Sequence, residues 1–118
     1  MKEIKKITSR GKLTLNYMQL GDDLIAVLSG GDEHIGAAAV STYDKSKKFA
    51  SSSVITLPGH LDDIISQPLS RLISEATSKN VVFITGIHFD NITKREIEEI
   101  TAVSYEMADE MITMMEGN

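Results

Sequence analysis

The sequence predicts an α+β fold: a two-layer sandwich in which a largely antiparallel sheet is covered on one face by two helices. The first half of the chain has short alternating or apolar stretches bounded by glycine, which are typical of strands. The second half has two stretches whose apolar residues recur at helical spacing. With 118 residues, 42% of them hydrophobic and 25% charged, we expect one globular domain over residues 1–118.

Five strands are expected before the first helix. Residues 12–17 alternate as Lys-Leu-Thr-Leu-Asn-Tyr, which predicts a strand with one buried face, and residues 3–8 form a weaker strand before it. Residues 24–28 are continuously apolar, which favours a central strand. The alanine-rich residues 35–43 form the fourth strand, where small side chains indicate close approach by a neighbour, and residues 49–57 form the fifth.

Residues 61–76 form the first expected helix. Their leucine, isoleucine and alanine residues fall on one helical stripe. Asp62 and Asp63 lie in the first turn, where the helix dipole favours acidic side chains. Pro68 is expected to kink this helix or break it in two.

A short buried strand at residues 81–84 and a second helix complete the predicted order, βββββαβα. Thr93 and Glu96 fit a capping box, so the helix begins there. We interpret the methionines of this helix as core or, failing that, as a packing face for another subunit in a homo-oligomer. Its apolar face is marked by Ile97, Ile100, Val103, Met107, Met111 and Met114.

Charge and composition exclude several classes of function. Residues 90–118 carry eight acidic and two basic residues in a chain of net charge −5, which argues against a nucleic-acid partner. Without cysteine there is no disulfide, thiolate zinc site or cysteine nucleophile. No apolar run approaches the roughly 18–20 residues of a membrane span, and no secretion signal is recognisable. We expect a cytoplasmic protein without a membrane partner.

The expected topology brings the three histidines to one edge of the sheet. If sequential strands run antiparallel, the loop after the third strand and the ends of the fifth and sixth strands lie at the same edge. These segments carry His34, His60 and His88. The turn that contains Arg10 emerges there too, as do the starts of both helices, whose free N–H groups bind anions.

Glycines gather near these histidines: five of the eight lie within four residues of one. Glycine lets the backbone approach a ligand closely. A cleft of this composition suits a phosphate or an extended aromatic anion. The candidate binding residues at this edge are Arg10, Gly30, Gly31, His34, Gly36, Gly59, His60, Gly86, His88 and Asp90.

Other interpretations of the histidines stay open. His34, His60 and His88, with Asp32 or Asp90, resemble a zinc or iron ligand set by type, although no spacing fixes two of them on one element. One histidine could also serve in acid–base catalysis, because its pKa lies near neutrality, but no Ser-His-Asp pattern or P-loop names a reaction. A structural component of a larger complex is a further alternative.

Three segments of the chain carry a family resemblance. They are residues 30–37, Gly-Gly-Asp-Glu-His-Ile-Gly-Ala; residues 58–63, Pro-Gly-His-Leu-Asp-Asp; and residues 86–93, Gly-Ile-His-Phe-Asp-Asn-Ile-Thr. Together, in this order, they resemble the prenylated flavin chaperone LpdD-like family, whose name comes from gallate decarboxylase. The resemblance extends from the third strand into the last helix.

The resemblance implies a function. Members of this family are small accessory proteins of UbiD-type aromatic-acid decarboxylases, thought to bind prenylated flavin mononucleotide (prenylated FMN) and to help deliver it. We therefore expect a chaperone, not an enzyme, that binds prenylated FMN or FMN transiently and serves a UbiD-type decarboxylase. Arg10 or Lys12, helix starts and glycine N–H groups would meet the phosphate, and Ile35, Ile87 and Phe89 would wall the ring system.

Overall fold

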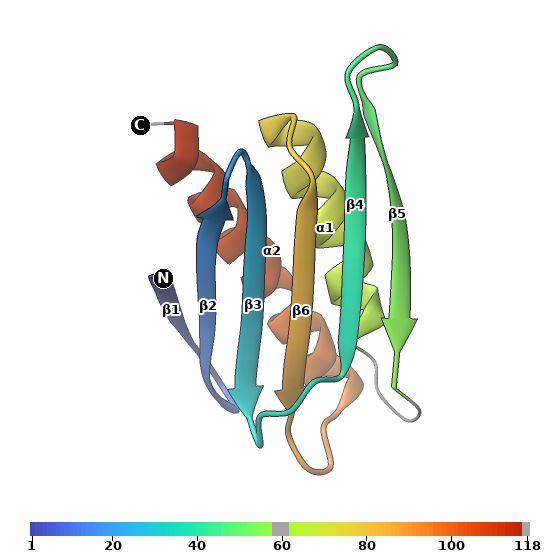
Figure 1. Ribbon diagram of the computed structural model, residues 1–118. Helices are drawn as coiled ribbons and strands as arrows, with labels where there is room; N and C mark the ends of the chain where they lie inside the picture. The colour runs from blue at the N-terminus through green and yellow to red at the C-terminus, as the bar shows by residue number, and fades with distance from the viewer. Residues whose placement is uncertain (58–61, 117–118) are drawn as a thin grey trace.

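The computed structural model describes residues 1–57 and 62–116, which form two layers (Figure 1). A mostly antiparallel sheet stands in front, and both helices lie behind it, so the predicted α+β fold and the order βββββαβα are confirmed. The strands are β1 (Lys2–Thr8), β2 (Gly11–Leu20), β3 (Asp23–Gly31), β4 (Ala37–Asp44), β5 (Phe49–Thr56) and β6 (Val81–His88), and the helices are α1 (Asp63–Thr77) and α2 (Lys94–Glu116).

The strand order in the sheet is β1-β2-β3-β6-β4-β5. Strand β6 lies between β3 and β4, parallel to the first and antiparallel to the second, so β3 and β4 are not paired although they are consecutive in the chain. Their directions are still opposite. The ends of β3, β5 and β6 and the start of β4 therefore meet at one edge, at the bottom of Figure 1. We call this edge, marked by Gly31, Ala37, Thr56 and His88, the strand-end edge.

The core lies between the sheet and the helices. Side chains at every second strand position point toward the helices, and Phe83 at the centre of the sheet is fully buried. Each such side chain removed from water contributes roughly 1.5–3 kcal/mol. Met107 and Met111 of α2 are also fully buried, which agrees with the core interpretation of the methionines, whereas Met114 is 41% exposed.

Helix α1 runs unbroken from Asp63 to Thr77 with Pro68 inside it, so of the two predicted outcomes, a kink or a break, the break is wrong. Proline removes one intrahelical hydrogen bond and crowds the preceding turn. Ile65 and Leu69, on either side of Pro68, are both buried against the core. We attribute the continuity of the helix to this packing, which outweighs the local preference.

Helix α2 begins at the predicted capping box. The backbone N–H of Thr93 donates to Oε1 of Glu96 at 2.9 Å, and the backbone N–H of Glu96 donates to Oγ1 of Thr93 at 3.2 Å. Two N–H groups that the helix leaves without partners are thereby satisfied. Among the described residues, no helix combines the length and hydropathy that crossing a membrane requires.

Candidate functional site at the strand-end edge

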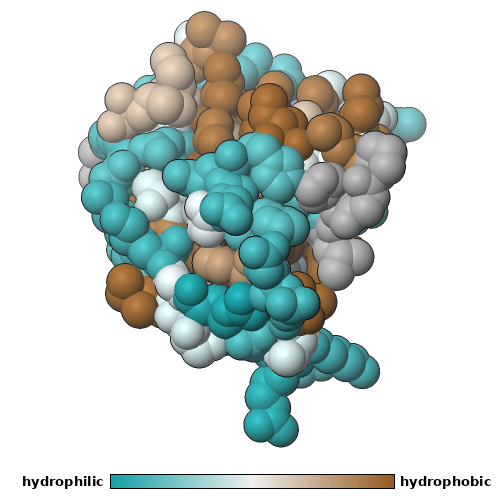
Figure 2. Space-filling model, turned by 90° about the horizontal axis from the view of Figure 1, so that it is seen from below, coloured by the Kyte–Doolittle hydropathy of each residue, from teal (hydrophilic) through white to brown (hydrophobic). Residues whose placement is uncertain are grey.

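The structure places His34 and His88 side by side. Their ring centroids are 5.6 Å apart, with the planes inclined by 61°. His88 ends β6, and His34 lies in the connection from β3 to β4. Gly59 and His60 fall among residues 58–61, outside the described residues. Figure 2 looks directly at this edge: hydrophilic residues cover much of its centre, and hydrophobic residues gather along the upper margin.

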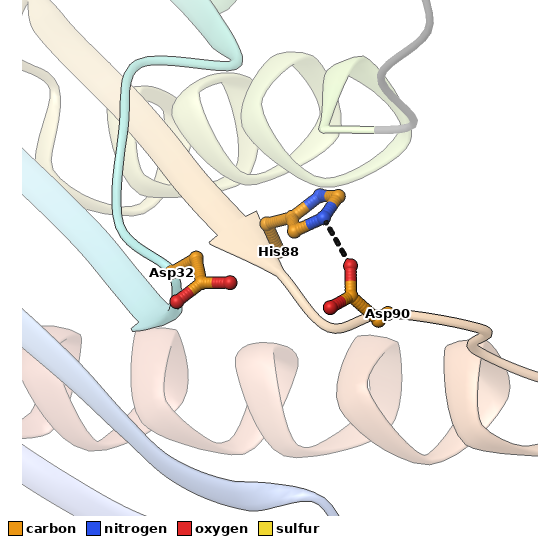
Figure 3. Close-up of side chains that lie close together, drawn as sticks. All are labelled: Asp32, His88 and Asp90. Atoms are coloured by element: carbon orange, nitrogen blue, oxygen red, sulfur yellow. Dashed lines mark hydrogen bonds and ion pairs between the residues drawn. The ribbon is translucent and has the colours of Figure 1, made fainter.

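Two carboxylates accompany His88 (Figure 3). Nε2 of His88 lies 3.0 Å from Oδ1 of Asp90, in the loop after β6. Asp32 follows the end of β3, and one ligand atom from each of Asp32, His88 and Asp90 lies within 4.8 Å of the others. Among residues 1–57 and 62–116, those brought together with metal-ligand spacing are thus one imidazole and two carboxylates. His60 of the predicted three-histidine set lies outside this part of the chain.

Arg10 is engaged with protein atoms at this edge. Its Nη1 lies 3.0 Å from Oε1 of Glu96, and its Nη2 donates to the carbonyl oxygen of Asp90 at 2.6 Å. The guanidinium also lies over the ring of Phe89, 5.6 Å from the centroid. The pKa of Glu96 is lowered, chiefly by the Thr93 N–H and also by Arg10. Arg10 therefore fastens the β1–β2 turn to the loop between β6 and α2.

The glycines at the strand-end edge allow other parts of the same chain to pack closely against them. A Cβ on Gly86 would lie 1.8 Å from the carbonyl oxygen of His34, and one on Gly36 would lie 1.8 Å from Oδ2 of Asp62. The N–H of Gly36 donates to the carbonyl oxygen of Thr85 at 2.9 Å. Residues 32–36 can lie against the end of β6 only because these side chains are missing. Gly30 and Gly31 are the last two residues of β3.

A pocket of about 290 Å³ opens beside the histidine–carboxylate group, between α1, α2 and the loop after β6. Ile87 and Phe89, two of the three expected wall residues, line it, whereas Ile35 is 57% exposed and does not. The other lining residues are Asp62, Ile64, Ile65, His88, Asp90, Asn91, Ile92, Ile97, Ile100 and Thr101.

Asp62 is a site residue that the sequence alone did not reveal. Its residue surface is only 4% exposed, and its Oδ1 accepts the backbone N–H of Ile87 at 3.2 Å. The only sequence signal was the pair Asp62-Asp63 at a helix start, which we interpreted as a favourable helix-dipole contact. A buried carboxylate that lines an apolar pocket is a tertiary feature that this local pattern does not carry.

A larger hollow, of about 830 Å³, lies at the opposite edge of the sheet. It is lined by the two ends of the described chain, including Met1 and Glu116, and by Tyr17 and Lys79. None of the described candidate residues lines it. The pocket beside His88 is the smaller one, but it joins an apolar wall to a group of polar side chains, which is the usual composition of a ligand site.

The described residues thus form an α+β sandwich with an apolar pocket beside a polar edge. The profile of the prenylated flavin chaperone LpdD-like domain family matches residues 7–116, so the chain belongs to this family and the resemblance is confirmed. Membership of a chaperone family makes it an accessory protein rather than an enzyme.

Two known proteins extend this comparison. Protein LpdD of Lactiplantibacillus plantarum (strain ATCC BAA-793 / NCIMB 8826 / WCFS1) is 26% identical over 103 residues, which cover 84% of this chain and 74% of that protein. A solved structure of a chaperone complex for yeast 20S proteasome assembly matches with a TM-score of 0.63 and 12% identity over 95% of each chain. At that identity the second likeness shows the fold alone.

Proposed function

We propose that this chain binds prenylated FMN, or FMN, transiently at the strand-end edge and hands it to a UbiD-type decarboxylase. Family membership supports the chaperone role. The single structural observation that supports the location is the apolar pocket that adjoins His88 and Asp90.

The pocket suits the flavin ring system. Its volume of about 290 Å³ is near the lower end of small-molecule sites, roughly 300–1,000 Å³, so it would take part of a flat ring rather than enclose a whole nucleotide. Ile64, Ile87 and Phe89 supply apolar wall, and Ile64 is 44% exposed at the pocket. A partly open site agrees with a cargo that must be released.

The phosphate fits less directly, because carboxylates dominate the centre of the edge. Asp32 and Asp90 would repel a phosphate dianion, and Arg10 is already occupied by Glu96. Lys12 at the start of β2 and Lys94 at the start of α2 are exposed cations on this edge. We assign the phosphate to such exposed cations, whose attraction is weakened by water and salt.

The test is an anaerobic titration of the purified protein with reduced prenylated FMN and, separately, FMN, followed by flavin fluorescence. Ile64→Asp places a charge at the apolar wall and should raise Kd by about tenfold or more, because burial of one aliphatic side chain is worth more than the roughly 1.4 kcal/mol that tenfold represents. Leu20→Asp, which alters an exposed leucine at the end of β2, at the opposite edge, is the matched control and should leave Kd within about twofold.

The same proteins should then be mixed with an apo decarboxylase of the UbiD type and prenylated FMN. The wild type and Leu20→Asp should speed the appearance of decarboxylase activity, and Ile64→Asp should not. A wild type that neither binds flavin nor changes the rate of activation would refute the proposal. If both variants lost flavin affinity and activation to the same extent, the flavin site would lie elsewhere on the protein.

A second candidate function, metal binding, is favoured by Asp32, His88 and Asp90. Their ligand atoms lie within 4.8 Å of one another, and a mixed imidazole–carboxylate set is suited to first-row transition metals. A bound dication would also offset the carboxylate charge that opposes a phosphate. The candidate is therefore compatible with the flavin proposal and does not depend on it.

Metal binding is tested by calorimetric titration of tag-free protein with Zn²⁺ and Mn²⁺ alone. One ion per chain is expected, with affinity lowered about tenfold or more in Asp32→Asn and in His88→Ala, since each removes one of three ligands. Asp109→Asn, at an exposed acidic residue in α2, should bind as the wild type does. Absence of saturable binding would remove this candidate without touching the flavin proposal.

A further inference from the structure

The open face of the sheet is unusually apolar. Both helices pack on the opposite face, and among the described residues only the connection 32–36 lies over this one, against the end of β6. In an antiparallel sheet with one solvent-exposed face, apolar residues that point inward normally alternate with polar residues that point outward. Here the outward positions at the centre of the sheet are apolar as well, which is the pattern of strands buried on both faces.

The outward apolar side chains form two adjacent rows across the strands. In each row the neighbours are register partners in the sheet, and neither row contains a charged residue. Within them Ile55 is 76% exposed, Val40 45% and Met18 40%. The first row is Met18, Ile25, Val82 and Val40, and the second is Val27, Ile84, Ala38 and Ile55.

Figure 2 views the open face of the sheet from its end. The upper margin of that view is the open face of the sheet, and hydrophobic residues are gathered along it.

We infer that two copies of this chain pack through their open sheet faces to form a dimer. The charge distribution favours a second copy as the occupant. The chain carries a net charge of −5, and residues 90–118, with eight acidic and two basic residues, form α2 and its connection on the opposite side of the sheet. Packing through the uncharged rows keeps the two acidic helices on the outer surfaces of the pair.

The size of the face is sufficient. Strands spaced about 4.8 Å apart, with a rise of about 3.3 Å per residue, give the five strands that carry the two rows, over about seven residues, an area of roughly 550 Å² per copy. Two copies would bury roughly 1,100 Å², which slightly exceeds the approximately 1,000 Å² expected of a specific interface. The strand-end edge lies at the rim of this face, so both pockets would remain accessible.

Sedimentation velocity and light scattering over a range of protein concentrations test the inference. The wild type should be a dimer at micromolar concentration, and Val40→Glu should raise the dimer dissociation constant by at least about a hundredfold, because two unpaired carboxylates would be buried at the interface. Tyr105→Glu, at a tyrosine 37% exposed on α2, adds the same charge to the helical layer and should remain a dimer.

A milder variant distinguishes a weakened dimer from a misfolded chain. Val40→Thr keeps the β-branched shape in a strand and should weaken the dimer by about tenfold while the far-UV circular dichroism stays unchanged. A monomeric wild type would overturn the inference, as would a dimer that Tyr105→Glu disrupts and Val40→Glu does not. If the wild type is monomeric and the open face becomes protected from hydrogen exchange only on addition of a decarboxylase, the occupant is that partner and the dimer is excluded.

Discussion

Nη1 of Arg10 lies 3.0 Å from Oε1 of Glu96, and this pair joins the turn between β1 and β2 to the first turn of α2. The same carboxylate oxygen accepts the N–H of Thr93 and closes the capping box. One carboxylate thus caps the start of α2 and holds a distant hairpin. Because the loop from Asp90 to Thr93 lies between the two, the pair also fixes one wall of the pocket beside His88.

Arg10→Ala should destabilise the protein. Apart from the ion pair, the substitution removes the hydrogen bond to the carbonyl oxygen of Asp90 and the contact with the Phe89 ring, and we expect a loss of about 1 kcal/mol in unfolding free energy from these two. Urea unfolding measures it. Arg71→Ala, which breaks an exposed pair with Glu75 at 3.8 Å, should change little. Equal effects in both variants would contradict the structural role of Arg10.

Glu96 should contribute a pH-dependent part of the stability. Its pKa is lowered in the folded chain, first by the Thr93 N–H and then by Arg10, relative to an ordinary glutamate near 4.3. The unfolded chain therefore takes up the proton first as the pH falls. The stabilisation is present above pH 4.3 and is lost below it, as the pH falls through the folded pKa.

Glu96→Gln tests this dependence, because the amide oxygen can still accept the Thr93 N–H while the charge is absent. Urea unfolding at pH 7 should find the variant less stable than the wild type, and at pH 3 the difference should shrink. Glu98→Gln, at an exposed position in the same turn, serves as the control. A difference that stays constant between the two pH values would mean that the charge of Glu96 does not stabilise the fold.

Local patterns predicted the elements well because local forces decide them. The period-two alternation over residues 12–17 marks β2, and the spacing of Thr93 and Glu96 marks the start of α2, since each depends on neighbours a few positions apart. The insertion of β6 between β3 and β4 was not predictable in the same way. Strand pairing across long separations depends on packing that no local window contains.

The candidate site was likewise predictable only in part. His34 and His88 could be assigned to one edge, because strand direction alone brings them there. What surrounds them could not be predicted: Arg10 is engaged by Glu96, and the carboxylate of Asp62 is buried at the pocket. These outcomes depend on which side chain reaches which partner in the folded chain. Whether the edge binds flavin stays a prediction.

Gly86→Ala should displace residues of the candidate site, although it adds only one methyl group. The new methyl group would meet the carbonyl oxygen of His34 at 1.8 Å, so residues 32–36 would have to move away from β6, at a cost of about 1–3 kcal/mol. The imidazole resonances of His34 and His88 in NMR spectra should both shift. Gly21→Ala is the control: it strains a backbone with φ of +62° but has no atom within 4 Å, and it lies at the opposite edge.

In the Gly21→Ala spectrum the two histidine resonances should stay in place, although the protein loses some stability from backbone strain. If Gly86→Ala leaves both resonances where they were, residues 32–36 do not lie against β6 in solution. The proposed pocket would then lose the polar edge that gives it its chemistry.

Thr85→Val should leave the protein as stable as before or make it more stable, by up to about 1 kcal/mol. Thr85 is fully buried in β6, and its Oγ1 has no hydrogen-bond partner among the described residues. A buried hydroxyl without a partner costs free energy, and valine has the same shape without the hydroxyl. The backbone carbonyl that accepts the Gly36 N–H is untouched, so residues 32–36 should keep their place.

Ser41→Ala provides the contrast, because Ser41 is equally buried and its Oγ lies 2.7 Å from Oγ of Ser70. Loss of that hydrogen bond should lower the unfolding free energy, measured with urea, by about 1 kcal/mol. Ser41→Ala should therefore destabilise the protein, whereas Thr85→Val should leave it equally stable or stabilise it. Should Thr85→Val destabilise the chain as much as Ser41→Ala, the Thr85 hydroxyl must have a partner in solution.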